Sequence, residues 1–142
     1  MSVLNVQETS ILYRGASIYE LLNYFKGINL PKTAAEKEEF VEFINLKLSS
    51  SDEVLQVEYP SFISTTIDPE KCPFLRDPGV KTTFAVGRNV KGIYLGKGVK
   101  ISPFSNTEGE ILAAPKQKCT VLSIAYDRVH DRIDLEVVLG DL

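Results

Sequence analysis

The stretch Thr107-Glu-Gly-Glu-Ile-Leu-Ala-Ala-Pro115 places two glutamates, Glu108 and Glu110, at the head of a short apolar run. In a strand, residues i and i+2 share one face, so both carboxylates point into the same space, about 6–7 Å apart along the backbone. Gly109 faces the other way, where the missing side chain lets another segment approach closely. Such a pair can stabilise a positively charged transition state, although a Glu-x-Glu alone is more often a solvated strand face.

Two other segments supply chemistry that complements the glutamates. Ile11-Leu-Tyr-Arg-Gly15 delivers an arginine at the end of an apolar run, and Arg14 can fork onto phosphate oxygens in a way that lysine cannot. Tyr59-Pro-Ser-Phe-Ile-Ser-Thr-Thr66 predicts a strand that ends in three hydroxyls, with Ser64 and Ile63 on opposite faces. Each segment also has a plainer interpretation, as a surface ion-pair partner and as the cap of a strand end.

In this order, the three segments resemble the motifs of the mono-ADP-ribosyltransferase toxin family. The arginine-serine-glutamate branch of that family carries an aromatic-Arg motif, a Ser-Thr-Ser motif and a Glu-x-Glu motif on separate strands. Here Arg14 comes first, Ser64-Thr-Thr66 follows about fifty residues later, and the glutamates lie about forty-five residues beyond that. Thr66 stands where the family usually has serine and keeps the hydroxyl. The resemblance covers most of the chain from Ile11 onward.

The resemblance implies a division of roles among the catalytic residues. Glu110 would lie beside the nicotinamide ribose of NAD and stabilise the oxocarbenium-like sugar that forms when nicotinamide leaves. Ser64 would orient Glu110. Glu108 would face the incoming nucleophile, and a glutamate at this place goes with modification of arginine, because it can orient the guanidinium and assist its deprotonation. Neither carboxylate binds a metal in this scheme.

The resemblance also implies which residues bind NAD and the protein substrate. Arg14 would hold the phosphates, and the main chain of Gly15 would meet the nicotinamide carboxamide. The segment Cys72-Pro-Phe-Leu-Arg-Asp-Pro78 would add a stacking aromatic and a basic residue, and the loop Ser102-Pro-Phe-Ser-Asn-Thr107 an aromatic that faces the target protein. The NAD-binding residues expected on this basis are Arg14, Gly15, Ser64, Thr65, Thr66, Phe74 and Arg76, and those expected at the protein substrate are Phe104 and Glu108.

The hydrophobic pattern predicts two helices followed by a strand-rich remainder. Ser17 with Glu20, and Thr33 with Glu36, are capping-box pairs, and apolar residues recur at helical spacing after each pair. From Val54 onward, short β-rich runs alternate with Gly, Pro and Asp. We expect strands over 54–58, 62–66, 82–86, 93–95, 110–113, 120–126 and 133–139, the last two forming a hairpin.

Helices first and strands after indicate an α+β domain, with short N-terminal helices before a strand-rich core of two packed, mainly antiparallel sheets. The chain of 142 residues, 44% hydrophobic and 25% charged, has the composition of one soluble domain over residues 1–142. Two cysteines cannot form a disulfide framework, and a single histidine, His130, argues against a zinc site. His130 lies between two apolar runs, where a turn is expected.

Charge and hydropathy narrow the range of partners. A net charge of −3 and a pI near 5.2 argue against a nucleic-acid backbone, because such binding needs clustered Lys and Arg. No apolar stretch is long enough to span a bilayer, and residues 1–7 lack the features of a conventional signal peptide. We therefore expect a soluble protein, and the resemblance to the toxin family implies that it is secreted or injected into a target cell, with an immunity or delivery protein as a further partner.

Together with these observations, the resemblance implies an NAD-dependent, arginine-directed mono-ADP-ribosyltransferase, the catalytic domain of a bacterial toxin or virulence effector. Family members commonly place a run of helices before the arginine strand, and only thirteen residues precede Arg14 here. The chain is then either a minimal version or a piece of a larger polypeptide. Two alternatives stay open. One is an NAD glycohydrolase toxin on the same fold, in which water replaces the acceptor; the other is a non-catalytic binding module.

Overall fold

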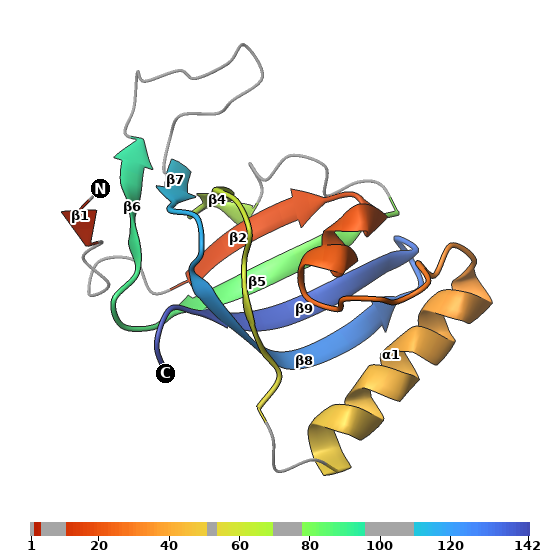
Figure 1. The fold of residues 1–142 in the computed structure, drawn as a ribbon. Coiled ribbons are helices and arrows are strands. Elements are labelled where there is room, and N and C mark those ends of the chain that lie inside the picture. Colours follow the sequence, from red (N-terminus) through yellow and green to blue (C-terminus); the bar gives the residue numbers. More distant parts are fainter. Residues whose placement is uncertain (1, 4–10, 51–53, 70–77, 96–109) are drawn as a thin grey trace.

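The structure is a computed structural model that describes residues 2–3, 11–50, 54–69, 78–95 and 110–142 (Figure 1). The first helical segment is a 3-10 helix, and the second is an α-helix. The elements are β1 (Ser2–Val3), β2 (Ile11–Ala16), η1 (Ile18–Asn23), α1 (Ala34–Ser50), β3 (Gln56–Glu58), β4 (Ile63–Thr66), β5 (Val80–Val86), β6 (Lys91–Leu95), β7 (Glu110–Ala113), β8 (Lys118–Asp127) and β9 (Arg132–Leu139).

The strands are hydrogen-bonded in the order β1-β6-β7-β4-β2-β5-β9-β8-β3. Every pair is antiparallel except β5 with β9. We call β1, β6, β7 and β4 the glutamate half of the sheet, and β2, β5, β9, β8 and β3 the arginine half. Among the described residues, one backbone pair, Tyr13 with Thr66, joins the two halves between β2 and β4. The expected α+β class and mainly antiparallel core are confirmed, and the two expected sheets are joined at this pair.

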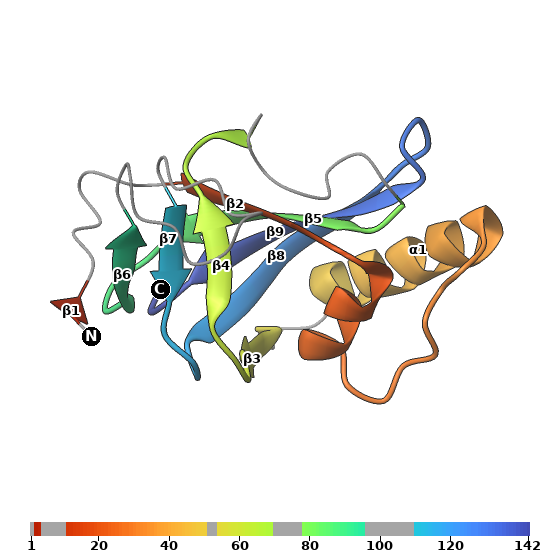
Figure 2. The ribbon, with the colours of Figure 1, turned by 90° about the horizontal axis from the view of Figure 1, so that it is seen from above.

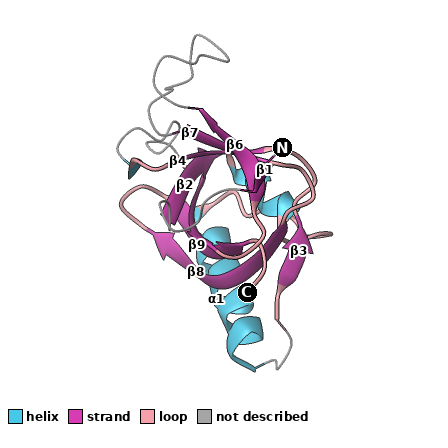
Figure 3. Cartoon of the chain, turned by 90° about the vertical axis from the view of Figure 1, so that its left-hand side faces the viewer, coloured by secondary structure: helices cyan, strands magenta, loops and turns pink. Residues whose placement is uncertain are grey.

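The sheet is curved, as an end-on view makes clear. Figure 3 shows β6 and β7 above, β8 and β9 below, and β2 and β4 between them. Alternation along each strand directs apolar side chains into the space that the sheet and the helices enclose. The largest fully buried side chains are Tyr24, Tyr59, Phe84, Leu12, Leu21, Ile63, Ile133, Leu135, Leu139, Val80, Val90 and Val137.

Helix α1 packs on β8 and begins at the capping box expected from the sequence (Figure 1). The main-chain N–H of Glu36 donates to Thr33 Oγ1 at 3.1 Å, and the main-chain N–H of Thr33 donates to Glu36 Oε1 at 3.1 Å. The buried Lys37 Nζ also donates to the carbonyl of Asp131 at 2.9 Å and pairs with its carboxylate at 3.1 Å. The start of α1 is thus fixed both by its own cap and by the β8–β9 turn.

The other predicted capping box, Ser17 with Glu20, is wrong. Ser17 precedes η1 but makes no side-chain capping hydrogen bond. The carboxylate of Glu20 instead lies against Arg14 of β2, at 2.6 Å. A capping box would give the Glu20 carboxylate only a neutral main-chain donor. In the folded chain the carboxylate binds the charged guanidinium of Arg14 instead, because hydrogen bonds between charged groups are stronger.

The predicted strands are all present, with small differences at their ends. The hairpin of β8 and β9 is confirmed, and it holds His130 in its turn as expected. His130 Nδ1 lies 2.8 Å from Asp127 Oδ2, and the main-chain N–H of His130 donates to Asp127 Oδ1. Strand β1 was not predicted, because two residues are too few to show the alternation of apolar and polar residues that indicates a strand. No helix in the described ranges is long and apolar enough to cross a membrane.

Candidate active site

A serine and a glutamate from neighbouring strands meet in the glutamate half of the sheet. Ser64 Oγ of β4 donates to Glu110 Oε1 of β7 at 3.0 Å. Glu110 is only 9% exposed, and its second oxygen, Oε2, is buried with no hydrogen-bond partner among the described residues. Buried polar atoms without partners are unfavourable and rare in folded proteins. Oε2 is therefore the part of this pair whose hydrogen-bonding capacity the described residues leave unused.

The arginine predicted for the site reaches the same serine from the other half of the sheet. Arg14 Nη1 of β2 donates to the main-chain carbonyl of Ser64 at 3.2 Å. Figure 2, seen from above, shows β4 and β7 side by side, with β2 running across the end of β4, where Tyr13 pairs with Thr66. Ser64 thus contacts Arg14 through its carbonyl and Glu110 through its hydroxyl. The three residues that carry the proposed motifs are brought together.

Arg14 is held by an acid that the sequence pattern assigns to a helix cap. Its Nε donates to Glu20 Oε2 at 2.6 Å, and the side chain of Arg14 is 23% exposed. Burial is the largest single influence and opposes the charge on Arg14, but the charge and hydrogen bond of Glu20, together with Tyr59 and Tyr24, outweigh it, so the pKa of Arg14 is raised above its ordinary value. No local pattern in the sequence marks this pair, because Arg14 lies in β2 and Glu20 lies in η1.

The remaining described residues of the prediction lie around these three. Gly15 is buried and follows Arg14 in β2. Thr66 Oγ1 accepts a hydrogen bond from the main-chain N–H of Asp68 at 3.2 Å, and so closes the turn after β4. Thr65 is 3% exposed, and its Oγ1 donates to the carbonyl of Ile111 at 2.8 Å. Thr65 therefore ties β4 to β7, on the face opposite Ser64.

Four predicted residues, Phe74, Arg76, Phe104 and Glu108, lie outside the described residues. Strand β7 begins at Glu110, the second glutamate of the motif. The roles of these four residues stay predictions. Among the residues that are described, no group of three or more His, Cys, Asp or Glu side chains is placed to hold a metal ion.

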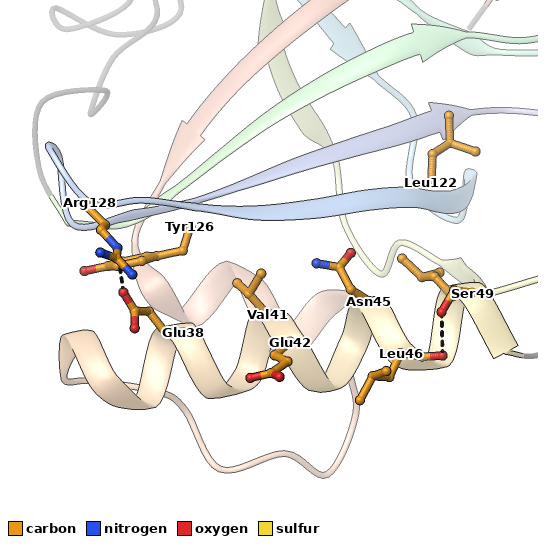
Figure 4. Close-up of a pocket in the computed structure, with 10 residues that line it drawn as sticks. Glu38, Val41, Glu42, Asn45, Leu46, Ser49, Leu122, Tyr126 and Arg128 are labelled. Carbon is orange, nitrogen blue, oxygen red and sulfur yellow. Dashed lines mark hydrogen bonds and ion pairs between the residues drawn. The ribbon is translucent and has the colours of Figure 1, made fainter.

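A hollow of about 790 Å³ lies elsewhere on the molecule, between α1 and β8 (Figure 4). The ion pair of Arg128 Nε with Glu38 Oε1, at 2.7 Å, occupies one end of it. Its lining is Glu38, Val41, Glu42, Asn45, Leu46, Leu48, Ser49, Leu122, Tyr126 and Arg128. None of the residues at the meeting of β2, β4 and β7 lines it, so the hollow is separate from the candidate active site.

Comparison with known proteins gives a match in structure but not in sequence. No known family profile and no curated protein matches the chain. The Clostridium limosum C3 exoenzyme matches with a TM-score of 0.58 and 19% identity, over 92% of this chain and 59% of its own. The fold is that of the ADP-ribosyltransferase toxins.

Two further structures with this fold give similar values. An ADP-ribosyltransferase from Clostridium botulinum matches with a TM-score of 0.61 and 19% identity, over 95% of this chain and 64% of its own. A protein from S. aureus, solved with NAD, matches with a TM-score of 0.62 and 13% identity, over 94% of this chain and 63% of its own. The chain thus spans 59 to 64% of the length of these three structures.

Proposed function

We propose that this chain is the catalytic part of an NAD-dependent mono-ADP-ribosyltransferase. It would transfer ADP-ribose to an arginine side chain of a target protein, release nicotinamide, and act as a bacterial toxin or effector. The observation that supports this most is the hydrogen bond of Ser64 with Glu110, which leaves Glu110 Oε2 buried and without a partner in the described structure. Arg14 lies next to this Ser64–Glu110 pair, because it donates to the Ser64 carbonyl, and the fold is shared with ADP-ribosyltransferase toxins.

Glu110 would act on the bond between ribose and nicotinamide. When that bond breaks, its electron pair leaves with the nicotinamide nitrogen, and positive charge develops on the ribose. A carboxylate held in a largely buried place stabilises this charge more strongly than water does. Ser64 occupies Oε1, so that Oε2 is left for a ribose hydroxyl.

Arg14 would bind the phosphates of NAD. A guanidinium has five N–H groups, of which one on Nε and one on Nη1 are bound within the described residues, where the other three have no partner. Planar, bidentate donors match phosphate oxygens well. Arginine is charged at any physiological pH, and the raised pKa of Arg14 acts in the same direction.

The resemblance to the toxin family supplies the rest of the proposal. An arginine nitrogen of the target would form a bond with the ribose carbon as nicotinamide leaves, and Glu108 would accept the proton that this nitrogen gives up. Phe104 would contact the target protein. Phe74 and Arg76 would complete the binding of nicotinamide and phosphate.

The deciding experiment is to incubate the protein with labelled NAD and a cell lysate, with Glu110→Gln as the inactive comparison. We expect label on an arginine of one or a few proteins with the wild type, located by mass spectrometry, and none with the variant. Release of nicotinamide without labelled protein, even when many lysates are tried, would favour an NAD glycohydrolase instead. Absence of both activities would favour a binding module.

A further inference from the structure

An acidic residue outside the three motifs holds the arginine of the site. Glu20 of η1 is only 4% exposed, although it carries a carboxylate. Its Oε2 accepts the 2.6 Å hydrogen bond from Arg14 Nε. We propose that Glu20 is a positioning residue, which fixes the guanidinium of Arg14 in the orientation that binds the phosphates of NAD. This inference rests on the proposed function, because it takes the ligand of Arg14 to be NAD.

The geometry around Arg14 leaves little freedom of rotation. A planar group is fixed in space when two of its atoms are anchored, and here Nε is anchored on Glu20 while Nη1 is anchored on the carbonyl of Ser64. The second N–H of Nη1 and both N–H groups of Nη2 have no partner in the part of the chain that the structure describes, and would be open to a ligand. A binding group that is already ordered loses less conformational entropy when the ligand arrives, which favours affinity.

Glu20 is itself held on its other oxygen. Its Oε1 accepts hydrogen bonds from Tyr59 Oη at 2.6 Å and from Asn23 Nδ2 at 2.8 Å. Burial, and then the charge of Glu20, raise the pKa of Tyr59, so its hydroxyl keeps the proton that it donates. The carboxylate of Glu20 is thus surrounded by three donors, and it cannot turn away from Arg14 without losing all of them.

The stability of the fold alone does not account well for the buried ion pair of Arg14 with Glu20. Buried ion pairs contribute little net stability, because removing two charges from water opposes their attraction. The ion pair does fix the orientation of the Arg14 guanidinium. Glu20 lies in η1, and Arg14 lies in β2 next to the joint between the two halves of the sheet. The chain of contacts from Glu20 through Arg14 to Ser64 ends on the hydroxyl that binds Glu110.

The test is a double-mutant cycle on the affinity for NAD, measured by calorimetry on the full chain. Glu20→Gln keeps the shape of the side chain but loses its charge, and we expect it to weaken NAD binding about 10-fold, the size of one charged hydrogen bond. It should raise KM much more than it lowers kcat. In the Arg14→Lys background, the same change should have little further effect, because both substitutions remove one interaction.

Two neighbouring tyrosines provide a milder variant and its control. Tyr59→Phe removes one donor to Glu20, and we expect NAD binding about 3-fold weaker. Tyr24→Phe is the control, since the Tyr24 ring lies 5.7 Å from that of Tyr59 and is equally buried, but its hydroxyl has no partner among the described residues. Tyr24→Phe should leave affinity unchanged. Should Glu20→Gln fail to fold, these two variants carry the test.

The outcomes separate this inference from the proposed function. Lack of NAD binding by the wild type would overturn the proposed function, and with it the ligand assigned to Arg14. Normal binding by the wild type together with equal affinity in Glu20→Gln and Tyr59→Phe would overturn the positioning role alone. Independent, additive losses in the cycle would also overturn it, because Glu20 would then act on NAD by a route that does not pass through Arg14.

Discussion

Ser64 and Glu110 are hydrogen-bonded at 3.0 Å although they do not lie opposite each other in the sheet. In the register of β4 and β7, Ser64 pairs with Leu112, and Thr66 pairs with Glu110. The contact is therefore diagonal, across a backbone separation of about 7–8 Å, which only a long side chain can bridge. Aspartate at position 110 would fall short, so both the length and the charge of the glutamate are needed.

We expect Ser64→Ala to lower the rate of nicotinamide release about 10- to 100-fold. The variant loses the hydrogen bond that orients Glu110, and hydrogen bonds to charged groups have about this effect. Enzyme assays with saturating NAD measure it directly. Ser61→Ala is the matched control, because Ser61 is exposed and its hydroxyl lies 3.4 Å from the carbonyl of Phe62. An unchanged rate in Ser64→Ala would show that Glu110 needs no orientation.

Glu110→Gln should reduce both transfer and NAD hydrolysis about 10²–10³-fold, while the protein stays folded. The amide keeps the shape of the side chain but loses the charge opposite the oxocarbenium. Glu136→Gln, on the exposed face of β9, controls for the loss of a surface carboxylate. Activity within a few-fold of the wild type in Glu110→Gln would contradict the assignment. Thermal unfolding of the variant verifies the fold.

Arg14→Lys should weaken NAD binding substantially, although the charge is conserved. An ammonium group cannot reproduce the forked contact with phosphate oxygens, nor reach Glu20 and the Ser64 carbonyl at once. Arg88→Lys is the comparison, since Arg88 is exposed and donates to the carbonyl of Leu142. Equal NAD affinity in the wild type and Arg14→Lys, measured by calorimetry, would make Arg14 a structural residue.

Glu108→Gln separates the transferase from the glycohydrolase. If the acceptor is arginine, the variant should lose transfer to protein much more than it loses nicotinamide release, because water needs no guanidinium to be oriented. The ratio of the two activities is the quantity to measure, in one preparation. A parallel fall of both would place Glu108 in the machinery that breaks the NAD bond, and no change in either would leave Glu110 as the only functional glutamate.

The start of α1 predicts a pH dependence of stability. Hydrogen bonds from the Thr33 backbone, then from its side chain, lower the pKa of Glu36. A lowered pKa stabilises the fold above the unfolded value of about 4.3, and this contribution is lost as pH falls through the folded value. Glu36→Gln should thus be less stable than the wild type at pH 7, and the difference should shrink in acid. Urea unfolding at both pH values measures it, and Glu39→Gln on the same helix controls for surface charge.

The sequence predicted well those features that depend on neighbours along the chain. Alternation placed Ile63 and Ser64 on opposite faces of their strand, and in the structure Ile63 is buried whereas Ser64 is exposed. The Thr33–Glu36 capping box appeared where expected, because its two partners lie only three residues apart in the chain. The order of the three motifs predicted an ADP-ribosyltransferase fold, and the structural comparisons confirm that fold.

What the sequence could not predict depends on partners distant along the chain. Ser17 with Glu20 has the same pattern as Thr33 with Glu36, yet Glu20 is taken by Arg14 and by Tyr59, which lies 39 residues away. The parallel pairing of β5 with β9 and the unpartnered oxygen of Glu110 also arise only when separate strands come together. Periodicity describes one segment at a time, so it cannot show these contacts.

The single pair of Tyr13 with Thr66 is the narrowest connection in the sheet, and the site lies across it. Arg14 belongs to the arginine half, whereas Ser64 and Glu110 belong to the glutamate half. A ligand that binds Arg14 and Glu110 together would therefore act as a clamp between the two halves. Amide hydrogen exchange along β2 and β4 would slow when such a ligand binds. The exchange rates of these two strands would therefore show whether the site is occupied, even without catalytic turnover.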